Sequence, residues 1–355
     1  MRNVDLVLLV VTVLLTLFGL LMVYDASSYI AFRDFGDKYH YIKDQFMWVV
    51  IGFLGLFFFS FFNYKSLFNL SLPIMFFGIM LLLLVFVPGI GVFALGARRW
   101  IDLRLFTIQP AEFIKLALAI YLAAWFSQKE KGRLLAFLLL LGVVGGLVLL
   151  EPDMGTATII FSEALIVYFL SGANLLHFFL IAPAVFVLGF FLITLEPYRA
   201  SRLYAFLRLS HSVEVSSYHI KQILIALGVG GLSGVGLGQS IQKYAYLPEN
   251  ATDSIFAVIA EELGFIGATI VVVLLAVVVW RGILIASCAK DAFGKLLAGG
   301  ITSFLAVQMI LNLGSQTALL PLTGIPLPFI SYGGSSLIVA LCAVGILLNI
   351  AKQSV

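Results

Sequence analysis

Long apolar stretches separated by short polar connections make up most of the chain. A helix that crosses a lipid bilayer needs ~20 predominantly apolar residues, and ten stretches approach or reach that length. They lie near residues 6–24, 46–62, 68–88, 109–126, 134–150, 156–171, 174–195, 255–280, 296–315 and 335–350. The pattern predicts an all-α polytopic integral membrane protein with about ten transmembrane helices, folded as a single transmembrane domain over residues 1–355.

Composition supports this class and excludes others. Hydrophobic residues make up 62% of the chain and charged residues 11%, far from the balance of a water-soluble domain. The first apolar run lacks a small-residue cleavage site and further spans follow it, so a retained helix is expected rather than a cleaved signal. Net charge is only +3, and no basic cluster alternates with aromatic residues, so no nucleic acid partner is expected. The four histidines and two cysteines show no metal-ligand spacing.

Basic residues in the short connections indicate the orientation. Ten spans place both termini on one side, and the rule that short cytoplasmic connections are rich in Lys and Arg assigns that side to the cytoplasm. The segment "QKEKGR" at 128–133 is the best single indicator, because it joins two spans with almost nothing else in it. The outer face then receives connections 25–45, 89–108 and 316–334 and one long extracytoplasmic loop, about 196–254, between helices 7 and 8.

An acid and a base lie within the fourth span. Glu112 and Lys115 are three residues apart and share one helix face. An ionisable side chain at membrane depth costs at least ~2.5–3.5 kcal/mol on insertion scales, so it needs a partner or water. Two interpretations remain open: a pair that fixes helix packing, or the lining of a cavity that binds a charged ligand.

Other polar groups sit at or within predicted spans. Asp153, in "EPD", is placed to cap the sixth span, and Glu163, in mid-span, must face protein or water. Gln308, Asn312 and Gln316 recur at four-residue steps and form one polar stripe. Interhelical hydrogen bonding would explain such a stripe without any ligand.

The long outer loop combines three features. Residues 196–207, "EPYRASRLYAFL", suit an amphipathic helix at the membrane interface. Six glycines follow between residues 228 and 238 without a nucleotide-binding P-loop pattern, so a tightly packed or re-entrant backbone is expected, or exposed amides near a pyrophosphate. Asp253 then directly precedes the eighth span. From spacing alone, Thr252, Asp253 or Ser254 could simply cap that helix.

Several longer motifs resemble those of one family. They are "LMVYDASS" at 21–28, "ARRWIDLRLFTIQPAEFIKLAL" at 97–118, "LLEPDMGTA" at 149–157, "YRASRLYAFL" at 198–207, "LIALGVGGLSGVGLGQSIQKYAYLPENATDSIFAVIAEELGFIG" at 224–267 and "LPLTGIPLPFISYGGSSL" at 320–337. Together they resemble the SEDS family of bacterial shape, elongation, division and sporulation proteins. The segment "GVGLGQSIQKYAYLPE" resembles the FtsW and SpoVE branch more than the RodA branch.

The resemblance implies an enzyme. It implies a peptidoglycan glycosyltransferase of the bacterial cytoplasmic (inner) membrane that polymerises lipid II on the outer face. Expected partners are a class B penicillin-binding protein acting as transpeptidase and other divisome or elongasome membrane proteins. No cofactor is certain, although a divalent cation such as Mg²⁺ could offset the substrate's pyrophosphate.

Site residues carry over by matching motifs. Asp253 matches the family's catalytic carboxylate, and Lys115, Glu112, Arg99 and Trp100 match motif positions expected to bind substrate. The family commonly reads His-Thr-Asp-Phe where residues 251–254 read Ala-Thr-Asp-Ser, so the acid is retained while the neighbouring imidazole and ring are missing.

Two other functions fit parts of the same pattern. A lipid II flippase or transporter would also carry charged residues within spans and Gly/Pro-interrupted helices, although no inverted repeat is evident. A scaffold that only recruits the transpeptidase is the second. Neither requires a carboxylate at the outer end of the eighth span.

Overall fold

The computed structural model describes residues 5–94, 97–102, 104, 106–128, 133–179, 181, 183, 187, 189, 215–244 and 246–354. Its helices are α1 (Leu6–Phe35), α2 (His40–Phe61), α3 (Ser66–Val85), α4 (Pro110–Phe126), α5 (Leu134–Leu150), α6 (Met154–Leu170), α9 (Val215–Gly230), α10 (Ile255–Cys288), α11 (Ala292–Gln316) and α12 (Gly334–Ser354). Its strands are β1 (Gly91–Ala94), β2 (Ala97–Asp102) and β3 (Thr107–Ile108).

The described helices confirm a polytopic helical membrane protein. Nine of the ten predicted spans coincide with a described helix, and six of these helices are long and apolar enough to cross a membrane by length and composition. The predicted seventh span (174–195) lies mostly outside the described residues. The predicted amphipathic helix (196–207) and most of the 128–133 connection lie outside them too.

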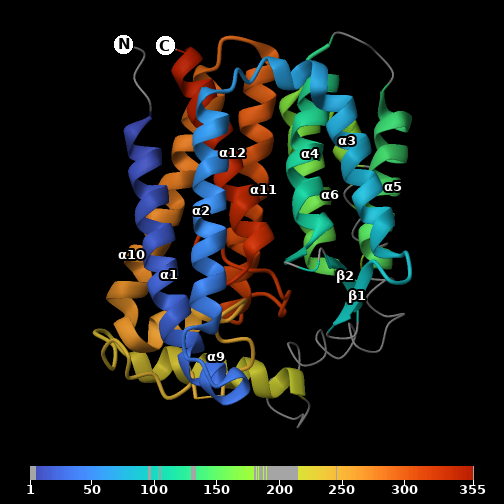
Figure 1. Cartoon of the computed structure of the whole chain (residues 1–355). Coiled ribbons are helices and arrows are strands. Elements are labelled where there is room, and N and C mark those ends of the chain that lie inside the picture. Colours follow the sequence, from blue (N-terminus) through green and yellow to red (C-terminus); the bar gives the residue numbers. More distant parts are fainter. Residues whose placement is uncertain are drawn as a thin grey trace.

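Both termini lie at one end of the helix bundle, while α9, β1 and β2 lie at the other end (Figure 1). Because the two termini lie at the same end, the arrangement agrees with an even number of spans. Strand β2, which carries Arg99 and Trp100, thus lies at the end away from the termini. The turn with Asp253 is at the same end, because the neighbouring Ser254 contacts His219 of α9.

A small sheet at this end was not predicted. Strands β1, β2 and β3 pair antiparallel in that order, with Val92 opposite Trp100 and Ile101 opposite Ile108. They are only four, six and two residues long, too short for an alternating pattern to stand out from the surrounding connection. The sheet matters because β2 carries Arg99 and Trp100.

Small residues let the helices of the bundle approach closely. α11 packs on α4, α6 and α10, and α12 packs on α2. At Gly345 of α12, a Cβ atom would lie 2.4 Å from the carbonyl oxygen of Leu56 in α2. Close backbone approach of this kind is how transmembrane helices gain packing energy without a hydrophobic driving force.

The glycine-rich segment after α9 packs against a break in α10. Gly264, inside α10, has φ 65° and ψ −168°, which interrupts the helix. The backbone groups freed by this break pair with the loop. On one side of the break, the carbonyls of Glu261 and Glu262 accept from the N–H groups of Val235 and Gly236. On the other side, the N–H groups of Phe265 and Ile266 donate to the carbonyls of Gly231 and Leu232. Satisfying these groups is required near or within a membrane. The expectation of a tightly packed backbone is confirmed.

Buried charges fix the same loop to the bundle. Lys243 Nζ lies 2.8 Å from Asp25 of α1 and 3.0 Å from Glu262 of α10. Burial disfavours the ammonium, but hydrogen bonds to Asp25 and Glu262 outweigh it and raise the pKa of Lys243. The loop leading to residue 253 is therefore tied to two helices.

We expect Gly234→Ala to destabilise the protein by at least ~1–3 kcal/mol. Gly234 has φ 79°, and a Cβ atom there would lie 2.1 Å from the carbonyl oxygen of Glu262. Gly228→Ala is the matched control, because Gly228 is exposed on α9 with nothing within 4 Å of an added Cβ; it should be neutral or gain up to ~1 kcal/mol from helix propensity. Thermal unfolding in detergent measures both, and equal stability of the two variants would contradict the packing argument.

Candidate active site

Asp253 lies in the turn that leads into α10. It is half-buried, and its carboxylate accepts a hydrogen bond from Thr252 Oγ1 at 3.1 Å. The N-cap position of α10 belongs to Ser254, whose side chain makes no capping hydrogen bond. The Ser254 hydroxyl instead lies 2.7 Å from His219 Nε2 of α9. The turn is thus connected to the outer helix α9 as well as to α10.

The backbone around Asp253 is fixed on all sides. Each carbonyl of residues 251–253 accepts a hydrogen bond from α11 or from the segment after it. The donors are the Tyr332 N–H to Ala251 (2.9 Å), the Ser331 hydroxyl to Thr252 (2.5 Å) and the Asn312 amide to Asp253 (2.9 Å). Three consecutive anchored carbonyls fix the backbone that carries the Asp253 side chain.

Glu112 and Lys115 form a buried ion pair in α4. Their side chains are 4% and 0% exposed, and Lys115 Nζ lies 2.8 Å from Glu112 Oε2. Lys115 also donates to Gln308 Oε1 of α11 at 2.7 Å. The pair that fixes helix packing is therefore present, and an external ligand would reach Lys115 only after this cluster opens.

One face of α11 links the Glu112–Lys115 pair to the turn that carries Asp253. Gln308 bonds Lys115 and also donates to the Pro326 carbonyl at 3.0 Å. One turn further along, Asn312 donates to the Ile325 carbonyl at 2.8 Å and to Asp253. The predicted interhelical role of this stripe is confirmed at Gln308, which bonds α4, whereas Asn312 bonds the turn before α10 and the segment after α11. Gln316 is fully buried and has no hydrogen-bond partner within the described ranges.

Arg99 holds the "EPD" turn through neutral groups. Its guanidinium donates to the carbonyls of Glu151 (3.0 Å) and Pro152 (2.5 Å). No carboxylate of the part of the chain described here forms an ion pair with it. Trp100 follows it on β2 and is partly exposed. In the described part of the chain, no hydrogen bond joins the side chain of Arg99 or Trp100 to Lys115 or Asp253.

The two acids of this turn behave differently. Asp153 caps α6 as predicted, accepting from the Thr156 N–H at 3.0 Å, and it also accepts from Gln109 at 3.2 Å. Burial, followed by the charge of Asp153, raises the pKa of Glu151 to about 8, with Arg99 acting in the opposite direction. At neutral pH Glu151 is largely protonated, so it does not cancel the positive charge of Arg99.

Glu163 faces protein, as predicted. It is 0% exposed in α6, and neither carboxylate oxygen has a hydrogen-bond partner in the described structure. The charge of Lys115 acts on it. Within the described ranges, the one ion pair of Lys115 is therefore with Glu112.

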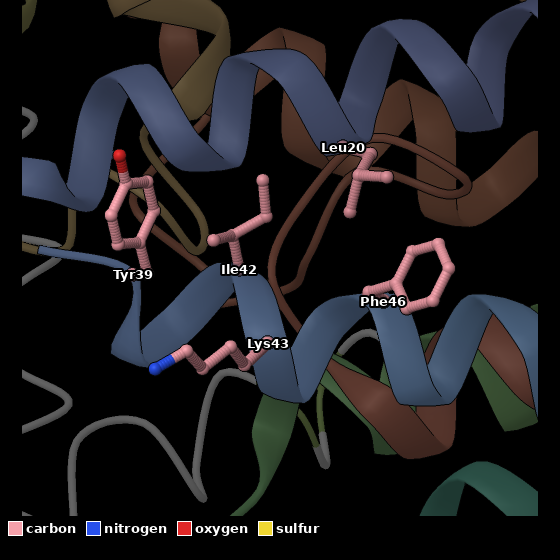
Figure 2. Close-up of a pocket in the computed structure, with 5 residues that line it drawn as sticks. All are labelled: Leu20, Tyr39, Ile42, Lys43 and Phe46. Carbon is pink, nitrogen blue, oxygen red and sulfur yellow. The ribbon is translucent and has the colours of Figure 1, made fainter.

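Neither a metal cluster nor the groove between α1 and α2 adds to this site. Within the described ranges, no three His, Cys, Asp or Glu side chains are grouped so that they could hold a metal ion; the divalent cation stays a prediction. An open groove of about 300 Å³ lies between α1 and α2, and Leu20, Tyr39, Ile42, Lys43 and Phe46 line it. Figure 2 shows these five side chains. None of the predicted site residues lines the groove.

Comparison with known proteins identifies the family. A family model for FtsW, RodA and SpoVE, described as "Cell cycle protein", matches residues 5–355. The chain belongs to this FtsW–RodA–SpoVE family. It is 42% identical to stage V sporulation protein E of Bacillus subtilis, over 99% of this chain and 97% of that protein. It is 40% identical to a probable peptidoglycan glycosyltransferase FtsW of Trichlorobacter lovleyi, over 98% and 93%.

Solved structures of the FtsW–RodA–SpoVE type share the fold. A chain from a peptidoglycan synthase complex, described as coordinating polymerization and crosslinking, superposes with a TM-score of 0.81 at 26% identity, covering 99% of this chain and 98% of that chain. The rod shape determining protein RodA of Thermus thermophilus superposes with a TM-score of 0.72 at 25% identity, covering 99% and 97%. The higher identities to SpoVE and FtsW agree with the predicted branch.

The structure adds residues that the sequence did not single out. Ser331 and Tyr332 anchor the Asp253 turn, and both fall inside a motif already matched to the family, which was the available signal. His219 reaches Ser254 from α9, and nothing in its sequence context marked it. Gln109 donates to Asp153, and the only sequence signal for it was its position directly before Pro110 of α4.

Proposed function

We propose that the chain is a peptidoglycan glycosyltransferase that polymerises lipid II into glycan strands, with Asp253 as the catalytic carboxylate. The observation that carries the proposal is a partly exposed acid, held by three anchored carbonyls, at the bundle end opposite the termini. The FtsW relatives named as probable peptidoglycan glycosyltransferases support the same reaction.

Asp253 acts as the general base. It accepts the proton of the acceptor sugar's 4-hydroxyl while that oxygen forms a bond to the anomeric carbon of the donor, and the bond to undecaprenyl pyrophosphate breaks. A positioned base contributes ~10²–10⁴-fold to such a step. Pyrophosphate leaves without strong acid assistance, unlike the alcohol of a glycoside, so no second carboxyl has to protonate it.

Arg99 is the group best placed to bind the pyrophosphate. It is partly exposed, its donors meet neutral carbonyls, and the neighbouring Glu151 is largely uncharged at pH 7. Trp100 beside it would contact the sugar or lipid portion. Lys115 and Glu112 are buried, so they act on the site through helix packing unless substrate binding opens their cluster. A divalent cation such as Mg²⁺ would share the phosphate charge.

The proposed orientation places both termini in the cytoplasm and Asp253 on the outer face of the bacterial cytoplasmic membrane. The partners would be a class B penicillin-binding protein and other divisome or elongasome membrane proteins. Support comes from the similar chain that belongs to a complex coordinating polymerization and crosslinking.

Reconstitution with lipid II tests the proposal. Protein in liposomes, with and without a cognate class B penicillin-binding protein, is expected to produce glycan strands detectable on gels. The break in α10 at Gly264 and the buried Glu163 are also features of transporters. Translocation of labelled lipid II without any polymer, in every condition, would refute the proposal and favour a flippase.

A further inference from the structure

Asn312 is buried beside the turn that carries Asp253 and donates hydrogen bonds there. Its side chain is 1% exposed in α11. The amide nitrogen donates to the Asp253 carbonyl at 2.9 Å and to the Ile325 carbonyl at 2.8 Å. The amide oxygen has no hydrogen-bond partner in the described structure. One NH₂ group thus joins two segments that are far apart in the sequence.

We infer that Asn312 is a positioning residue for the glycosyl transfer step, because it sets where the Asp253 carboxylate points. Anchoring the carbonyl of residue 253 fixes the peptide that follows its Cα atom, and hence the direction of its Cβ bond. The assignment rests on the proposed function, since Asn312 matters to the reaction only if Asp253 reacts.

The same amide also supports the other two anchors. Ile325, which Asn312 holds, begins the segment that carries Ser331 and Tyr332, the donors to Thr252 and Ala251. Losing the NH₂ group therefore removes one carbonyl anchor and loosens the segment that provides the others. Sites keep their geometry through supporting hydrogen bonds of this kind, and a misplacement near 1 Å costs ~10²-fold in rate.

A structural role and a positioning role differ in what they change. A residue needed only for folding lowers the amount or stability of the protein, while the folded fraction keeps its rate. A positioning residue lowers kcat of the folded protein and leaves substrate affinity almost unchanged, because the binding groups Arg99 and Trp100 lie on β2.

The experiment compares Asn312→Leu with Gln316→Leu in liposomes supplied with lipid II. Leu has the branched shape of Asn, is somewhat larger and has no donor. Gln316 is the matched control: it lies one turn away on the same stripe, is equally buried and bonds nothing in the described structure. For Asn312→Leu we expect kcat to fall ~10–10²-fold with KM within about threefold, and for Gln316→Leu no comparable loss. Asn312→Gln keeps an NH₂ group and should recover part of the rate.

Two further variants make every outcome informative. If Asn312→Leu does not fold, Asn312→Ser, which relieves crowding and also lacks the amide, gives the decisive rate. Wild-type kcat in any folded variant without the amide, an effect on KM alone, or an equal loss in Gln316→Leu would overturn the inference. Asp253→Asn is measured in parallel: full activity there refutes the proposed function itself, whereas an inactive Asp253→Asn beside a fully active Asn312→Leu refutes only the role of Asn312.

Discussion

Asp253→Asn is expected to lower lipid II polymerisation by ~10²–10⁴-fold, the contribution of a positioned general base. Asn has the same shape and can still accept from Thr252, so the turn should keep its fold. The amide cannot take up the proton of the sugar hydroxyl. Initial rates of glycan formation, measured on protein of unchanged thermal stability, give the result.

Glu249→Gln provides the matched control for Asp253. Glu249 lies in the same turn, is exposed, and also bonds the Thr252 hydroxyl, at 2.9 Å. Its replacement removes one negative charge next to the site without removing the proposed base, so polymerisation should stay within about twofold of wild type. Near-wild-type activity of Asp253→Asn, or an equal loss in both variants, would remove Asp253 from the mechanism and leave only a general effect of charge.

The sequence predicted the parts of the fold that depend on long apolar runs. α1, α10 and α11 coincide with predicted spans because a bilayer demands a length of apolar helix that few other structures share. The three strands were missed because their few residues carry no comparable signal. The break at Gly264 was also missed, since it exists only through hydrogen bonds to a loop 26 to 34 residues earlier in the chain.

The candidate site residues were named from motifs and short spacings, which carry no information on where distant segments of the chain meet. Asp253 was named from a local match, and the pairing of Glu112 with Lys115 from a three-residue spacing. Neither signal could show that the carbonyl of Asp253 is held from α11, because that contact spans 59 residues. Spacing also left open whether Lys115 serves structure or substrate, and its burial beside Glu163 alone does not decide between them.

Lys115→Met is expected to destabilise the protein by ~3–5 kcal/mol, the cost of removing one partner of a buried ion pair. Met fills most of the same space, so the loss arises from charge: Glu112 loses its counter-ion at 2.8 Å, and Gln308 loses a donor. Equilibrium unfolding in detergent measures the change. An unaltered stability would mean that the cluster is hydrated rather than sealed.

Adding neutral partners to Lys115→Met separates its two interpretations. The double variant with Glu112→Gln should recover most of the stability, because replacing a buried ion pair by neutral groups is often close to neutral in free energy. If Lys115 serves only packing, the stabilised double variant polymerises lipid II at near the wild-type rate. If the ammonium contacts the substrate's phosphates once the cluster opens, stability returns while KM for lipid II stays raised. A double variant as unstable as Lys115→Met alone would contradict the charge argument, because then the lost lysine would matter for its shape rather than for its charge.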